Sequence, residues 1–81
     1  MAPGANKVLR SIEMDDGGRC VDIFVRPNGT FGFEEYRRDS EDRRGWFAIG
    51  HHMGNVYTTA DGALQGALTK VAWLREAIGG N

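Results

Sequence analysis

The chain has little cysteine and no long hydrophobic run. Its one cysteine, Cys20, cannot form an internal disulfide, which suits a reducing compartment. No segment approaches the ~20 consecutive apolar residues that a membrane-spanning helix needs. Residues 1–7 lack the apolar stretch of a secretion signal. These absences predict a protein that has no membrane span and stays in the cytoplasm.

The sequence also lacks an excess of charge of either sign. Ten basic and eleven acidic residues give a net charge of −1, so no long-range field steers the chain toward nucleic acid or an anionic membrane. Hydrophobic residues make up 41% and charged residues 26%, which is typical of a folded domain. The 81 residues suffice for one domain with a small core. We expect flexible tails at 1–7 and 79–81 and a single domain over 8–78.

The clearest local pattern is a β-hairpin formed by residues 20–26 and 30–36. Pro27 presets the first corner of a type I turn, and Gly29 supplies the left-handed residue of a bulge, which together predict a three-residue loop. This loop pairs Val25 with Phe31, Ile23 with Phe33 and Val21 with Glu35. The register therefore gathers one apolar face that consists of Val21, Ile23, Val25, Phe31 and Phe33.

Two further strands complete the predicted sheet. Residues 45–50 form one strand, after a polar loop at 39–44. Residues 8–14 form an earlier strand or, alternatively, a short helical turn. If this segment is a strand, a type I′ turn at Asp16-Gly17 sets Ile12 opposite Val21 and Val8 opposite Val25.

A single helix is predicted from Thr59 to Ile78. Thr58 or Thr59 can cap it, and Asp61 lies in its first turn, where the helix dipole favours an anion. The predicted buried stripe consists of Ala60, Leu64, Ala67, Leu68, Val71, Leu74 and Ile78. The predicted fold is α+β: a three- or four-stranded antiparallel β-meander packed on one C-terminal α-helix.

The opposite side of this helix carries Gly62, Gly66, Thr69 and Trp73. Two glycines one turn apart weaken a helix but let another backbone or a flat ring approach closely. We therefore predict that this strip is a contact surface, most simply the seam of a symmetric dimer.

Three side chains are candidates for catalysis or metal binding: Cys20, His51 and His52. Adjacent histidines on a strand point to opposite faces, and no paired ligand spacing is present. Cys20 lies within a strand, away from the strained turns and helix N-termini that activate thiols. A metal-dependent or hydrolytic activity at these residues is therefore the weakest alternative. The sequence predicts no catalytic residue, no metal and no cofactor.

The sheet face away from the helix carries Phe24, Tyr36 and Trp46. One helix covers only one face of a sheet, so these rings need cover from the N-terminal segment, a second subunit or a ligand, unless they are simply exposed. Asp22 and Glu34 face each other there, with Arg19, Arg37 and Arg38 close enough to offset the repulsion.

The C-terminal third resembles the ending of short, uncharacterised bacterial proteins. The shared features are a Tyr-x-Thr-Ala entry into the helix at 57–60 and a Val-x-Trp-Leu ending at 71–74, after an aromatic-rich hairpin. Gly62 and Gly66 depart from that pattern. The resemblance implies no activity, cofactor or site residue.

These observations predict a small non-enzymatic protein-interaction module that binds a protein partner or self-associates as a homodimer. The first alternative is a nucleic-acid-binding domain that uses the sheet face or the Arg37–Arg44 loop. Acidic residues interleave the arginines of that loop, so nucleic acid is not the favoured partner.

Overall fold

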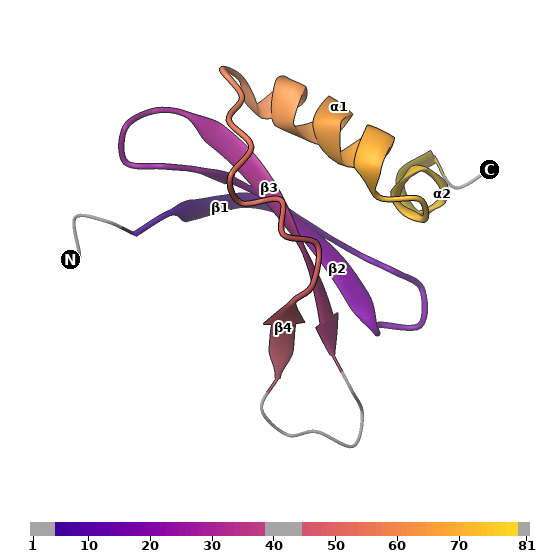
Figure 1. Cartoon of the computed structure of the whole chain (residues 1–81). Coiled ribbons are helices and arrows are strands. Elements are labelled where there is room, and N and C mark those ends of the chain that lie inside the picture. The colour runs from indigo at the N-terminus through magenta and orange to yellow at the C-terminus, as the bar shows by residue number, and fades with distance from the viewer. Residues whose placement is uncertain (1–4, 39–44, 80–81) are drawn as a thin grey trace.

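The structure, a computed structural model, describes residues 5–38 and 45–79 (Figure 1). In chain order the elements are β1 (Lys7–Glu13), β2 (Arg19–Val25), β3 (Phe31–Arg38), β4 (Trp46–Ala48), α1 (Ala60–Lys70) and α2 (Leu74–Gly79). The strands form one antiparallel sheet in the order β1-β2-β3-β4. Both helices lie on one side of it, as Figure 1 shows. The predicted α+β fold with a four-stranded β-meander is confirmed.

The β2–β3 hairpin has the predicted register. Val25 pairs with Phe31 and Ile23 with Phe33. Gly29 has a φ of 87°, which is the left-handed conformation that the turn requires. The N–H of Arg26 donates to the carbonyl of Thr30 at 2.7 Å and closes the loop. Turn chemistry and hydrophobic pattern agree at this hairpin, and the chain follows both.

The β1–β2 hairpin follows the prediction only in part. Ile12 pairs with Val21 as expected, but Val8 pairs with Phe24 and not with Val25. The shift arises from an irregularity between Val8 and Arg10, where an extra residue enters β1 as in a β-bulge.

The turn between these strands is not the expected type I′ turn, which requires positive φ at both Asp16 and Gly17. Gly17 has a φ of 72°, but Asp16 does not adopt the left-handed region. The N–H of Gly17 donates to the carbonyl of Met14 at 2.8 Å, and the N–H of Gly18 donates to Asp16 Oδ1 at 2.8 Å. Asp16 thus stabilises the loop through its side chain.

The fourth strand is shorter than the predicted 45–50, because regular pairing ends at Ala48. The polar loop expected at 39–44 lies outside the described residues. Beyond β4 the chain still follows the edge of β3: the N–H of Ile49 donates to the carbonyl of Glu35 at 2.9 Å, and Tyr57 forms an isolated bridge with Phe31. Residues 50–56 form a loop between these two attachments, which we call the edge loop.

The predicted single helix is wrong, because the chain forms two helices. Thr59 caps α1 through its side chain, which accepts from the N–H of Gly62 at 2.9 Å. Val71 then adopts an extended conformation and ends α1, and α2 begins at Leu74. Within the described ranges, neither helix is both long and apolar enough to cross a membrane.

The core lies between the sheet and the two helices. Its buried members are Ile12, Val21, Ile23, Phe33, Ala63, Ala67, Val71 and Leu74. Leu64 and Leu68 pack against it and are partly buried, as the predicted stripe implied. Ile78 is an exception: the break in the helix turns α2, and 37% of Ile78 is exposed. Ala63 takes a core position that the prediction did not include.

Candidate functional site

The sheet face away from the helices, which we call the far face, contains a pocket of about 310 Å³. Its walls come from all four strands and consist of Ser11, Glu13, Cys20, Asp22, Tyr36 and Trp46. Strand pairing explains the grouping, because Glu13 lies opposite Cys20, and Cys20 lies opposite Tyr36. Alternation along each strand points these side chains to the same side. In residues 5–38 and 45–79, no helix covers this face.

Asp22 is the polar centre of the pocket. Its Oδ1 accepts a hydrogen bond from the Ser11 hydroxyl at 2.6 Å and a weak one from the Cys20 thiol at 3.9 Å. Its Oδ2 accepts none from the described residues. One carboxylate oxygen is therefore held in place, while the other remains available as an acceptor.

The pocket has a negative electrostatic environment. Burial and the nearby Asp22 carboxylate raise the pKa of Cys20 from 9.0 to about 11. Burial also raises the pKa of Tyr36, and the charges of Asp22 and Glu34 raise it further. Both groups are therefore protonated and neutral at neutral pH. The carboxylates carry the charge of the site.

Two aromatic rings of the far face already carry a guanidinium group. Arg26 lies over the ring of Phe24 at 5.1 Å, and Arg38 lies over the ring of Trp46 at 4.7 Å. Tyr36 has no such cation among the described residues. The predicted set Phe24, Tyr36 and Trp46 therefore does share one face. However, Phe24 is buried, so Tyr36 and Trp46 are the members that line the pocket.

Arg26 also joins the far face to the edge loop. It donates hydrogen bonds to the carbonyl of Phe31 at 2.9 Å, of Met53 at 2.6 Å and of Asn55 at 3.0 Å. A side chain at Gly32 would meet both the Arg26 guanidinium and the Phe24 ring. The bare backbone at Gly32 therefore allows the arginine to cross β3.

Asp22 and Glu34 pair across the hairpin as predicted. The donors that reach them in the described residues are not the expected arginines. Glu34 is only 2% exposed, and its carboxylate accepts from the backbone N–H of Glu35 at 2.9 Å and of His52 at 3.1 Å. No local pattern in residues 50–56 indicates that the edge loop folds back onto this carboxylate, because these residues resemble an ordinary polar loop.

The structure does not assemble a site from Cys20, His51 and His52. The Cys20 thiol donates a weak hydrogen bond to Asp22, whereas the His52 ring packs against the Phe33 ring with centroids 4.8 Å apart. His51 is exposed and has a φ of 55°. In the part of the chain that is described, no three His, Cys, Asp or Glu residues are grouped so that they could hold a metal ion.

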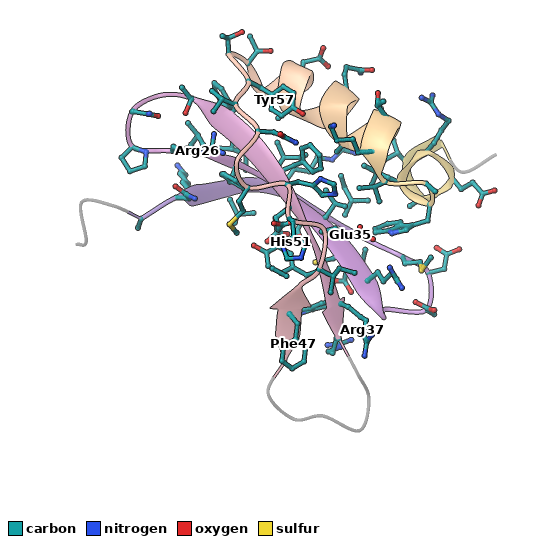
Figure 2. All side chains as sticks on the ribbon, in the orientation of Figure 1. Arg26, Glu35, Arg37, Phe47, His51 and Tyr57 are labelled. Atoms are coloured by element: carbon teal, nitrogen blue, oxygen red, sulfur yellow. The ribbon has the colours of Figure 1, made fainter. Side chains whose placement is uncertain are left out.

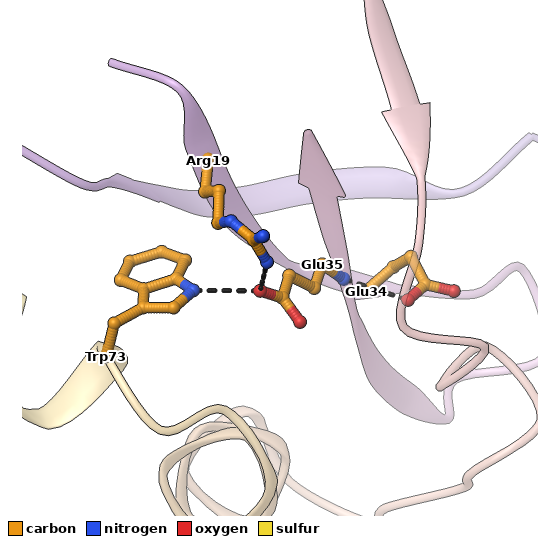
Figure 3. Close-up of polar contacts among 4 residues, drawn as sticks. All are labelled: Arg19, Glu34, Glu35 and Trp73. Atoms are coloured by element: carbon orange, nitrogen blue, oxygen red, sulfur yellow. Dashed lines mark hydrogen bonds and ion pairs between the residues drawn. The ribbon is translucent and has the colours of Figure 1, made fainter. Parts of the chain in front are cut away.

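The predicted helix strip does not face away from the rest of the chain. A side chain at Gly66 would lie 2.5 Å from Cζ of Tyr57, which packs beside α1 (Figure 2). Trp73 packs against the core, and its indole N–H donates to Glu35 Oε2 at 2.8 Å (Figure 3). Arg19 reaches the same oxygen at 3.4 Å. Gly62 also approaches Tyr57, and Thr69 is exposed and donates to the carbonyl of Gln65. The orientation predicted for Gly66 and Trp73 is therefore wrong.

Sequence reasoning identified Tyr36, Trp46 and Asp22 on the far face but missed Ser11 and Glu13. Their place in the pocket depends on the β1–β2 pairing, and the Asp16-Gly17 turn was the signal that could have located them. In comparisons with known proteins, no family model, curated protein or solved structure matches the chain. The function is therefore inferred from the geometry.

Proposed function

We propose that the chain is a small non-enzymatic protein-interaction module that presents the far face of its sheet to a protein partner. The observation that carries this proposal is the pocket on that face, where Tyr36 and Trp46 stand beside the carboxylates of Asp22 and Glu13. Aromatic side chains next to polar groups are enriched where proteins bind one another. A cytoplasmic location, which the free Cys20 thiol favours, is part of the same proposal.

The chemistry of the pocket suits binding better than catalysis. A thiol with a pKa of about 11 is a poor nucleophile at neutral pH, because almost none of it is ionised. The Ser11 hydroxyl donates to Asp22 directly, without an intervening histidine that could act as a general base. Among the described residues, side chains that could attack a substrate therefore line the pocket without neighbours that would activate them.

Nucleic-acid binding through this face has weaker support. Carboxylates line the pocket, while Arg26 lies over the buried Phe24 ring and Arg38 lies over Trp46 in the pocket wall. The carboxylates of Glu13 and Asp22 would repel a phosphate backbone that approached the pocket. Most of the Arg37–Arg44 loop lies outside the described residues. Binding through that loop stays a prediction, which a salt-dependent gel shift with mixed DNA and RNA would test.

Site-specific photo-crosslinking in the cells that make the protein tests the proposed function. A photoreactive phenylalanine analogue in place of Trp46 puts the label in the wall of the pocket and keeps an aromatic ring there, and the same analogue at Gln65 puts it on an exposed position of α1. We expect a discrete protein adduct from position 46 that is absent from position 65. Equal labelling from both positions, or no protein adduct from either, would overturn the proposal.

A further inference from the structure

We propose that the far-face pocket receives an arginine side chain of the protein partner. This inference rests on the function proposed above and specifies what the module recognises. Three features of the pocket support it: its charge, an aromatic ring that carries no guanidinium from the described residues, and its hydrogen-bond acceptors and volume.

The charge of the pocket calls for a cation. Glu13 and Asp22 line it, and the buried Glu34 carboxylate adds to the negative field that acts on Tyr36. Among the described residues, no cation forms an ion pair with any of the three. A positively charged group that entered the pocket would therefore interact favourably with carboxylates that have no ion pair within residues 5–38 and 45–79.

The aromatic rings indicate which cation fits. On the far face, Phe24 and Trp46 each carry an arginine guanidinium, whereas Tyr36, between them in the sheet, carries none from the described residues. The chain itself thus shows that rings of this face accept a guanidinium. Tyr36 lines the pocket and has no guanidinium from the described residues. A partner arginine that stacked on Tyr36 would repeat the arrangement seen at Phe24 and Trp46.

The acceptors in the pocket favour a guanidinium over an ammonium. Asp22 Oδ2 accepts no hydrogen bond from the described residues, and the Glu13 carboxylate is exposed at the rim. A planar guanidinium can lie on a ring and still direct its N–H groups to two carboxylates, which a compact ammonium cannot do. The volume of about 310 Å³ leaves room for the guanidinium group and part of the aliphatic stem of an arginine side chain.

A titration with N-acetyl-L-arginine N-methylamide, followed by amide NMR, tests this inference. The matched uncharged probe is N-acetyl-L-citrulline N-methylamide, which has nearly the same shape. We expect saturable shifts at Tyr36 and at the indole N–H of Trp46, but none at the indole of Trp73, which lies on the other side of the sheet. The arginine probe should bind about tenfold more tightly than the citrulline probe, because only the arginine probe gains the charge and cation–π interactions.

Variants separate the pocket from general surface charge. Asp22→Asn keeps an acceptor for Ser11 but removes the charge, and Glu13→Gln changes an exposed position. Each variant should lower the affinity of the pocket for the arginine probe about fivefold. Glu76→Gln, an exposed carboxylate on α2, is the matched control and should leave affinity unchanged. Equal affinity for the two probes, or equal losses in all three variants, would overturn the inference.

The two proposals fail in different ways. If position 46 yields a protein adduct but the arginine probe does not bind, the far face is an interaction surface that recognises something else. If the probe binds as expected but no protein adduct forms, the pocket takes a guanidinium and the proposed partner is wrong. An adduct that is lost in Asp22→Asn, together with probe binding that is lost in the same variant, would support both.

Discussion

At Gly66, the absence of a side chain lets the ring of Tyr57 lie against α1. A Cβ there would lie 2.8 Å from Cε1 of this ring, and the ring is held by the core and by the bridge between Tyr57 and Phe31. We expect Gly66→Ala to lower the free energy of unfolding by about 1–3 kcal/mol, because overpacking outweighs the better helix propensity. Chemical denaturation measures this.

A double-mutant cycle identifies the cause of that loss. In a Tyr57→Ala background the ring is gone, so Gly66→Ala should stabilise the protein by up to about 1 kcal/mol through helix propensity alone. Gly62→Ala is the milder comparison, because its Cβ would lie 3.1 Å from the capping Oγ1 of Thr59 and 3.7 Å from Cβ of Tyr57. If Gly66→Ala is stabilising in both backgrounds, Tyr57 does not constrain this position.

Cys20 makes the stability of the protein depend on pH in alkaline solution. An unfolded thiol with a pKa near 9.0 ionises before the folded thiol, whose pKa is about 11. The folded state therefore binds more protons between pH 9 and 11, and the free energy of unfolding falls as pH rises through this interval. The contribution from Cys20 is complete below pH 9 and decreases by about 2–3 kcal/mol by pH 11.

The matched control for this effect is Cys20→Ala. The variant should lose less stability than the wild type over the same rise in pH. The Cys20 charge is also one of the causes that raise the pKa of Tyr36, so the difference between the two curves reports Cys20 together with its effect on Tyr36. Urea denaturation at several alkaline pH values gives the two curves. If they run parallel, the pKa of the folded thiol is not raised.

At the scale of elements, prediction succeeded where two local signals agreed. In the β2–β3 hairpin, Pro27 and Gly29 require the same register that the alternating apolar residues require, and the chain adopts it. In β1, Val8 and Leu9 are both apolar and both exposed, so the pattern contains no signal for the irregularity beside them. The β2 and β3 residues of the pocket followed from the hairpin, whereas Ser11 and Glu13 followed only if residues 8–14 formed a strand, for which the sequence left a helical turn as the alternative.

The break between α1 and α2 shows a different limit. The apolar spacing from Ala60 to Ile78 is consistent with one helix, and no proline or glycine marks a stop near Val71. The contacts that accompany the break are tertiary: the indole N–H of Trp73 donates a hydrogen bond to Glu35 on β3, and Leu74 is fully buried. A single sequence does not reveal such long-range partners, and they override local helix propensity here.

Because of the break, two residues of the predicted buried stripe, Leu74 and Ile78, should differ in their contribution to stability. Leu74 is 0% exposed, and we expect Leu74→Ala to lower the free energy of unfolding by about 2–5 kcal/mol through lost burial and a cavity. Ile78→Ala, which removes a similar side chain from the exposed end of α2, should cost less than about 1 kcal/mol. Thermal and urea unfolding of the two variants measure the contrast. Similar losses in both would mean that α2 packs along its whole length, as one continuous helix would.

At the scale of the whole molecule, the structure bears on the expected self-association. The helix strip that the sequence offered as a dimer seam already has partners within the chain, namely Tyr57 at Gly66 and Glu35 at Trp73. Two far faces placed together symmetrically would bring the carboxylates of both pockets close to each other. β1 is an edge strand whose pairing with β2 contains an irregularity, and bulges in an edge strand hinder edge-to-edge pairing.

We therefore expect the chain to be monomeric in the absence of its partner, which favours a different protein as the occupant of the far face. Sedimentation equilibrium up to millimolar concentration should give the mass of one chain, and the value should not change with ionic strength. A concentration-dependent rise toward twice that mass would contradict this prediction, and three variants would then locate the contact. Thr69→Arg disrupts a seam on α1, Leu9→Arg disrupts pairing along β1, and Asp22→Asn relieves repulsion at the far face. If Thr69→Arg alone restored the monomer, the dimer seam predicted from the sequence would be correct despite the partners that Gly66 and Trp73 have within the chain.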